Sequence, residues 1–172
     1  MYKIENKTSD DISSITVLMK SFMPFAQKRM GWNRPPTIKF QSDPENAQNP
    51  LGRTGHYDPS SMTVAVYIDK RHPKDILRSL SHELVHHTQN CRGEFENATG
   101  AGEQGYAQND PHLRGMESEA YELGNMCFRD WEDGYKQSNY NIDVNVSVSL
   151  QEWRNDELNS LLMEKFIKGV KK

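Results

Sequence analysis

Apolar side chains recur every three or four positions in four segments of the chain, and this spacing is typical of amphipathic helices. The pattern predicts helices over residues 10–30, 72–89, 113–131 and 150–170. Asp10 or Asp11 can cap the first helix and Gly31 can end it, while Pro73 suits the first turn of the second. Each helix would place its apolar face against a core and its polar face in water.

Shorter apolar runs between these helices predict strands. Thr37 to Phe40 follows two prolines, and residues 53–57 and 62–68 form a hairpin around a turn at residues 58–61. Residues 141–150, "NIDVNVSVSL", alternate apolar and polar side chains, as in a strand or an extended arm. Helices and strands together predict an α+β fold.

One segment has neither pattern. Residues 91–112 hold four glycines and few large apolar side chains. They are expected to form a long, mobile loop, and loops of that length in a compact domain often carry function.

Length and composition fit one domain with a thin core. The chain has 172 residues, of which 35% are hydrophobic and 26% are charged. We expect a single domain over residues 1–172, with a core at about residues 35–131 and a C-terminal extension at residues 132–172. The two cysteines, Cys91 and Cys127, are expected to be free thiols of a reducing compartment.

The net charge, the hydropathy and the N-terminal sequence indicate which classes of partner to expect. A net charge of −3 argues against a nucleic-acid partner, and no apolar run approaches the roughly 18 residues that a membrane span requires. The N-terminal "MYKIENKTSDD" lacks the apolar stretch of a secretory signal. A cytoplasmic protein without a membrane or nucleic-acid partner is therefore expected.

The stretch "HELVH", from His82 to His86, carries the most informative chemistry. Residues four apart on a helix lie on one face, so two imidazoles can reach one Zn²⁺ at about 2.0–2.1 Å. Glu83 projects beside them, where it can contact a water on the metal. The apolar side chains of the same helix, Leu77, Leu80 and Leu84, point nearly the opposite way. His87 turns toward that apolar side and is expected to be packed or hydrogen-bonded.

The H-E-x-x-H motif alone could also be a chance match without a function. Three fixed positions match by chance in a chain of this size on the order of 1% of the time. A solvated helix face with histidines that bind nothing would show the same letters. The uncharged residues Leu84 and Val85 between the ligands, and the apolar face opposite, favour a metal site.

This segment resembles the active-site helix of the zincin metallopeptidases, in which two histidines bind zinc and the glutamate acts on a water. The resemblance implies a minimal zincin-like domain, with a small antiparallel or mixed sheet packed on this helix and additional N- and C-terminal helices. The metzincin extension is absent, because Gln89 and Arg92 stand at its positions, and no cysteine precedes the motif as in peptide deformylases. The glutamate type remains, in which a second helix supplies E-x-x-A.

The segment "RGMESEAYELGNM", residues 114–126, supplies a matching second helix. Its "ESEA" fits E-x-x-A, and the E-x-E-A-Y form is similar to small bacterial and phage HExxH proteins. A phage protein made in the host cytoplasm is one expectation from that likeness. Glu117 shares a side of the helix with the small residues Ala120 and Gly124, which permit close helix approach. Glu117 is therefore the expected third ligand.

Other residues could supply the third metal ligand instead of Glu117. Glu119, on the opposite flank of the apolar face, is the main alternative, and Glu122 is expected to face solvent. Further candidates lie in or beside the loop: Asp110, His112 and Glu103. Members of the family often have aspartate one residue after the alanine, where it orients a ligand histidine. This chain has Tyr121 there, so the partner of that histidine is undetermined.

The resemblance implies a zinc metalloendopeptidase that acts on a peptide or protein substrate. Glu83 would be the general base and Tyr121 the expected stabiliser of the carbonyl oxygen, with further candidates in Tyr106, His112 and Tyr57. Residues 62–68 could pair with an extended substrate, and residues 91–112 could cover the cleft.

Two alternatives belong to other functional classes. Zinc could be structural and non-catalytic, with Cys91 as a fourth ligand. The domain could instead be a vestigial peptidase that docks a protein partner through its C-terminal helix and basic tail, "KFIKGVKK".

Overall fold

The computed structural model describes residues 2–50, 52–95 and 110–143. It has two compact units, residues 1–131 and residues 132–172, and each is described by itself. The predicted helix at residues 150–170 and most of the predicted loop at residues 91–112 lie outside the described residues. Glu103 and Tyr106 lie outside them as well.

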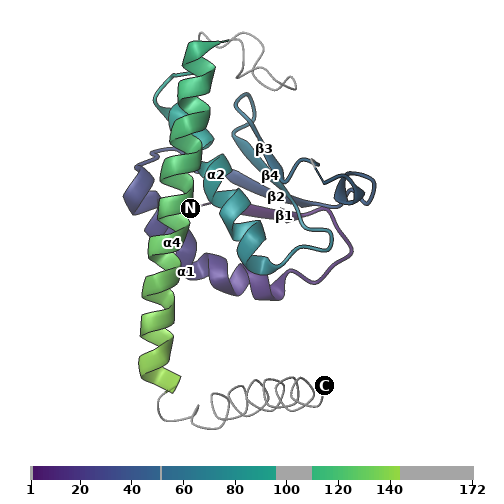
Figure 1. Cartoon of the computed structure of the whole chain (residues 1–172), viewed down its shortest axis with the longest axis vertical. Helices are drawn as coiled ribbons and strands as arrows, with labels where there is room; N and C mark the ends of the chain where they lie inside the picture. Colours follow the sequence, from purple (N-terminus) through teal and green to yellow (C-terminus); the bar gives the residue numbers. More distant parts are fainter. Residues whose placement is uncertain (1, 51, 96–109, 144–172) are drawn as a thin grey trace, which may run out of the picture. The chain divides into compact units, whose positions relative to one another are not determined.

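Residues 1–131 form an α+β fold around a mixed four-stranded sheet (Figure 1), which confirms the predicted class. The sheet has the order β1-β2-β4-β3. Parallel pairing joins β1 to β2 and β2 to β4, and antiparallel pairing joins β4 to β3. The strands are β1 (Lys3–Asn6), β2 (Thr37–Gln41), β3 (Gly55–Asp58) and β4 (Thr63–Tyr67).

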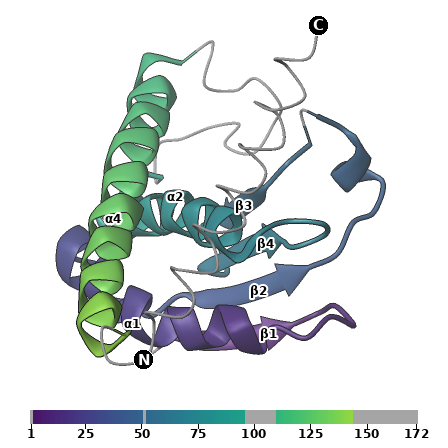
Figure 2. The same ribbon diagram turned by 60° about the horizontal axis from the view of Figure 1, so that its bottom comes forward.

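Within the described ranges, three longer helices accompany the sheet, together with the short 3₁₀ helix η1 (Asn46–Gln48). They are α1 (Ser13–Met30), α2 (Pro73–Cys91) and α4 (Pro111–Asp143), and the labels in Figures 1 and 2 follow this numbering. Both views show α4 passing across α2. No helix in the described ranges is long and apolar enough to cross a membrane.

Local chemistry explains where the predicted elements begin and end. Helix α1 starts after Asp11, whose Oδ1 accepts a hydrogen bond from the Ser13 backbone N–H at 2.9 Å, and it ends at Gly31 with a left-handed φ of 84°. Pro73 opens α2. In the β3–β4 turn, the Asp58 carboxylate accepts a hydrogen bond from the Ser60 backbone N–H at 3.0 Å, as the sequence predicts for this hairpin.

Two elements differ from the prediction. Strand β1 was not predicted, because "KIEN" is only four residues long and is recognisable only by its pairing with β2. Helix α4 continues to Asp143 and does not end at Trp131, so residues 141–143 are helical and not extended. Residues 132–143 carry almost no apolar face, so periodicity could not reveal that continuation. The rest of "NIDVNVSVSL" lies outside the described residues.

The core of the first unit lies where α1, α2 and the sheet meet. The α2 face predicted to be apolar is fully buried at Leu77, Leu80 and Leu84. Phe22 of α1 is also fully buried, and its ring lies 6.4 Å from the ring of Phe128 on α4. This aromatic contact joins α4 to α1, while the same helix also reaches α2.

We expect Phe22→Ala to lower the free energy of unfolding by about 3–5 kcal/mol, because it removes a buried ring that joins two helices. Val17→Ala on the same helix is the control, since Val17 is 56% exposed, and it should change stability by less than about 0.5 kcal/mol. Denaturant titration of both variants measures the difference. Equal losses in the two variants would contradict this description of the core.

Candidate metal centre

Helix α2 brings its two motif histidines together on one face. The Nε2 atoms of His82 and His86 lie 3.2 Å apart, and their ring centroids are 4.9 Å apart. His82 retains some exposure, whereas His86 is almost fully covered. This arrangement is the one that a spacing of four predicts for a helix.

Glu117 of α4 completes a group of three. Its Oε2 lies 3.4 Å from His82 Nε2, and its Oε1 lies 3.4 Å from His86 Nε2. Within the described ranges, these residues form the one group of three or more His, Cys, Asp or Glu side chains positioned to hold a metal ion. The structure thus brings together the three residues that the sequence selects as ligands.

The distances within this group fit a single small cation. Two donors at about 2.0–2.1 Å from a tetrahedral metal are roughly 3.3–3.4 Å from each other. His82 Nε2 and His86 Nε2 are 3.2 Å apart, each lies 3.4 Å from a different oxygen of Glu117, and one donor atom from each residue lies within 4.8 Å of the other two. Two imidazoles and one carboxylate are also a donor set that zinc accepts, and one that leaves a fourth position open. The residues present therefore fit a zinc ion in donor type and spacing.

Protein groups alone do not balance the negative charge of the Glu83 and Glu117 carboxyl groups at this site. Burial raises the pKa of Glu83, although the histidines act in the opposite direction. Burial would lower the pKa of His86, but its hydrogen bond to Glu117 and the charges of Glu83 and Glu117 outweigh that effect and raise it. The carboxyl groups of Glu83 and Glu117 thus favour added positive charge, which either protons or a cation can supply.

The Glu83 side chain of α2 faces strand β3. It is only 7% exposed, and its side chain lies against Gly55. A Cβ atom at Gly55 would stand 3.1 Å from Glu83 Oε1, so the glycine leaves the space that this carboxyl occupies. The edge of the sheet and the motif helix therefore meet at the predicted general base.

A close helix contact positions Glu117. A Cβ atom at Gly124 of α4 would lie only 3.0 Å from the Cα of His82, and the Ser81 hydroxyl donates a hydrogen bond to the Gly124 carbonyl at 2.7 Å. Glu117 precedes Gly124 by seven residues, which is about two helical turns and the same face. Contact at the glycine thus directs Glu117 toward the histidines, and fully buried Ala120 lies between them.

The alternative ligands have other partners. Glu119 forms an ion pair with Arg92 at 2.7 Å and accepts a hydrogen bond from Gln89. Asp110 accepts a hydrogen bond from the His112 backbone N–H at 2.7 Å, at the start of α4. His112 contacts the Glu94 carbonyl oxygen through Nε2 at 3.2 Å. Glu122 is exposed, as expected.

His87 is fully buried, which confirms the prediction that it turns toward the protein. Its Nε2 lies 2.7 Å from the Arg34 carbonyl oxygen, which can only accept, so Nε2 carries the hydrogen. Its Nδ1 then accepts from the Tyr57 hydroxyl at 3.1 Å, and burial raises the pKa of Tyr57 to about 12. Tyr57 is thereby held in a structural network.

Tyr121 and Cys91 were also candidates, as stabiliser of the carbonyl oxygen and as fourth zinc ligand, and only Tyr121 lies beside the group of three. Tyr121 is 63% exposed, and its ring centroid lies 4.7 Å from that of His82, so it stands beside the group of three at the surface of α4. Cys91 lies with its Sγ 3.7 Å from His87 Nε2 and is not a member of the group.

The sequence did not reveal the polar contacts that support His86. Gln89 Oε1 lies 2.8 Å from His86 Nδ1, and Gln89 itself is fully buried. Its position one turn after His86 was visible in the sequence. Its partners Met116 and Glu119, some thirty residues away, were not predictable from it.

We expect Gly124→Ala to destabilise the protein and weaken metal binding, because the new Cβ meets backbone atoms of α2 that cannot move independently. Gly115→Ala on the same helix is the matched control, since nothing lies within 4 Å of its added Cβ. The control should gain roughly 0.8–1 kcal/mol from helix propensity. Denaturant unfolding and zinc titration compare the two, and an equal gain in both variants would contradict the close contact.

No protein-family model, curated protein or solved structure matches the chain. The geometry of His82, His86 and Glu117, with the side chains around them, is therefore what indicates a function.

Proposed function

We propose that this protein is a zinc-dependent metallopeptidase of the glutamate-type zincin class. The observation that carries the proposal is the convergence of His82, His86 and Glu117, whose donor atoms lie within 4.8 Å of one another. The buried carboxyl group of Glu83 lies on the same helix as the histidines. The histidines and Glu117 would hold the ion. When bound, zinc polarises a peptide carbonyl and makes water easier to deprotonate.

Glu83 and Tyr121 would have separate roles in hydrolysis. Glu83 removes a proton from the attacking water and returns it to the leaving amine as the peptide C–N bond breaks. Its enclosure between α2 and Gly55 keeps the carboxyl group oriented. Tyr121, whose exposed ring packs 4.7 Å from the ring of His82, would donate a hydrogen bond to the carbonyl oxygen.

The strand that would bind substrate differs from the sequence-based expectation. Residues 62–68 contain β4, which pairs with β2 on one side and β3 on the other, so its hydrogen-bonding groups are already used. Strand β3 is one of the two edge strands of the described sheet, and it carries Gly55 next to Glu83. We therefore assign the pairing of an extended peptide to β3.

A structural zinc site receives less support. Such sites close with four protein ligands, often including cysteine, and Cys91 lies by His87, not by the group. A buried glutamate beside the ligands also has a use in hydrolysis and none in a closed structural site. The vestigial-domain alternative concerns the helix predicted at residues 150–170, and these residues lie outside the described ranges.

We expect Glu117→Ala to reduce zinc affinity strongly, because it removes one of three donors. Glu122→Ala, on the exposed face of the same helix, should bind zinc like the wild type. Metal analysis of purified protein and competition with a chromogenic chelator measure both. If Glu117→Ala keeps wild-type affinity, or if neither the wild type nor the control binds zinc, the proposed ligand set is wrong.

We expect Glu83→Gln to keep its zinc and lose peptide hydrolysis by roughly 10²–10⁴-fold, because the amide has the same shape but cannot accept the proton. Internally quenched peptide libraries and casein provide the substrates, and Glu122→Gln is the control. Hydrolysis that survives Glu83→Gln would contradict the role of Glu83. Zinc binding without hydrolysis in the wild type would instead favour the non-catalytic alternative.

A further inference from the structure

We propose that Gln89 is a positioning residue that holds His86 with its hydrogen on Nδ1, and that Glu119 and Arg92 in turn hold Gln89. The proposal rests on the proposed metal centre and deepens it. It concerns which nitrogen of His86 is available to a cation, and not the identity of the ligands.

The hydrogen-bond partners of Gln89 determine the direction of its amide group. Its Nε2 donates to the Met116 carbonyl oxygen and to Glu119 Oε2, both at 2.9 Å. Neither oxygen can donate, so the amide nitrogen must lie on that side and the amide oxygen must face His86. The side chain is fully buried, so water does not offer a competing arrangement.

The orientation of the amide then determines the proton position on His86. Gln89 Oε1 lies 2.8 Å from His86 Nδ1, and an amide oxygen only accepts, so Nδ1 must carry the hydrogen. In the neutral ring the lone pair is then on Nε2, the atom that faces His82 and Glu117. A partner of this kind also fixes the ring plane and raises the basicity of the ligand nitrogen.

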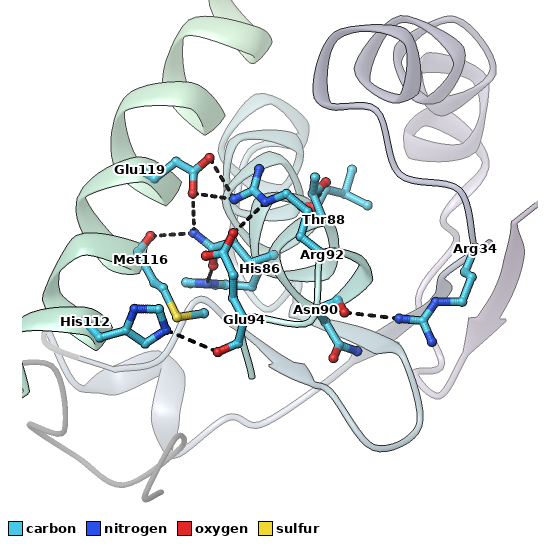
Figure 3. A network of polar contacts seen from close by, with 11 residues as sticks. Arg34, His86, Thr88, Asn90, Arg92, Glu94, His112, Met116 and Glu119 are labelled. Atoms are coloured by element: carbon cyan, nitrogen blue, oxygen red, sulfur yellow. Dashed lines mark hydrogen bonds and ion pairs between the residues drawn. The ribbon is translucent and has the colours of Figure 1, made fainter. Parts of the chain in front are cut away.

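Arg92 fixes the position of Glu119. Its Nη2 lies 2.7 Å from Glu119 Oε2 and 3.0 Å from Oε1, and its Nε donates to Glu94 Oε1 at 2.6 Å. Figure 3 shows the Arg92 guanidinium between Glu119 and Glu94. The carboxylate of Glu119 is thus held in place as the acceptor for Gln89, and one polar chain links the surface of the protein to the ligand ring.

The first test measures zinc affinity by chelator competition. Gln89→Leu preserves a buried side chain of similar size but removes the acceptor, and it should lower zinc affinity roughly 10–100-fold. Glu119→Ala should cause a smaller loss of at least about threefold, because Met116 still accepts from Gln89. Glu122→Gln is the control and should change nothing. Affinities of Gln89→Leu and Glu119→Ala within about twofold of the wild type would overturn the proposal.

The second test reads the proton position without zinc. In metal-free Glu117→Ala, where the competing carboxylate is gone, ¹⁵N NMR of the neutral His86 ring should show the hydrogen on Nδ1. In Glu117→Ala/Gln89→Leu it should move to Nε2. A purely structural role for Gln89 would leave that signal unchanged and would overturn the proposal. The result does not depend on zinc binding, so it distinguishes failure of this inference from failure of the metal centre.

Thermal unfolding of Gln89→Leu and of the wild type shows whether the variant folds. If it does not fold, Glu119→Ala decides the question, because Glu119 lies at the partly exposed end of the chain of contacts. An unchanged zinc affinity in folded Glu119→Ala would then overturn the proposal, and a loss confined to it and absent from Glu122→Gln would support it.

Discussion

The close contact between α4 and α2 at Gly124 is the constraint on which the candidate site depends. Backbone atoms of the two helices approach there so closely that a single methyl group would crowd the His82 backbone. The Ser81 hydrogen bond to the Gly124 carbonyl holds the contact in place. Two turns earlier on the same face, Glu117 reaches the histidines. A wider helix separation would leave two histidines on a helix and no third donor.

Charge gives the same site its chemical character. Glu83 and Glu117 bring two carboxyl groups next to two imidazoles, and Glu83 is almost fully buried. Uncompensated carboxylates in such a place are costly, and the raised pKa values of Glu83 and His86 express that cost. A divalent cation among the three donor atoms would compensate both charges and leave the histidines neutral. Helix packing and electrostatics therefore favour the same occupant.

Residues that act within one helix were largely predictable from the sequence. The spacing of His82 and His86, the buried face at Leu77 and the inward turn of His87 all follow from helical periodicity. Small residues near Glu117 also indicated, correctly, that it would approach the motif helix. Relations between distant segments were harder to predict. The order of the strands, which makes β3 an edge strand, depends on pairing that no local pattern specifies.

Polar contacts between the helices were the hardest features to predict from the sequence. Gln89 looks like an ordinary polar residue until Met116 and Glu119 are seen to orient its amide. The most direct test of the whole account is X-ray absorption spectroscopy of the zinc-loaded protein. The account predicts one zinc per chain with only nitrogen and oxygen neighbours at about 2.0–2.2 Å, two of them imidazoles. A sulfur neighbour at about 2.3 Å, or a spectrum without imidazole scattering, would contradict it.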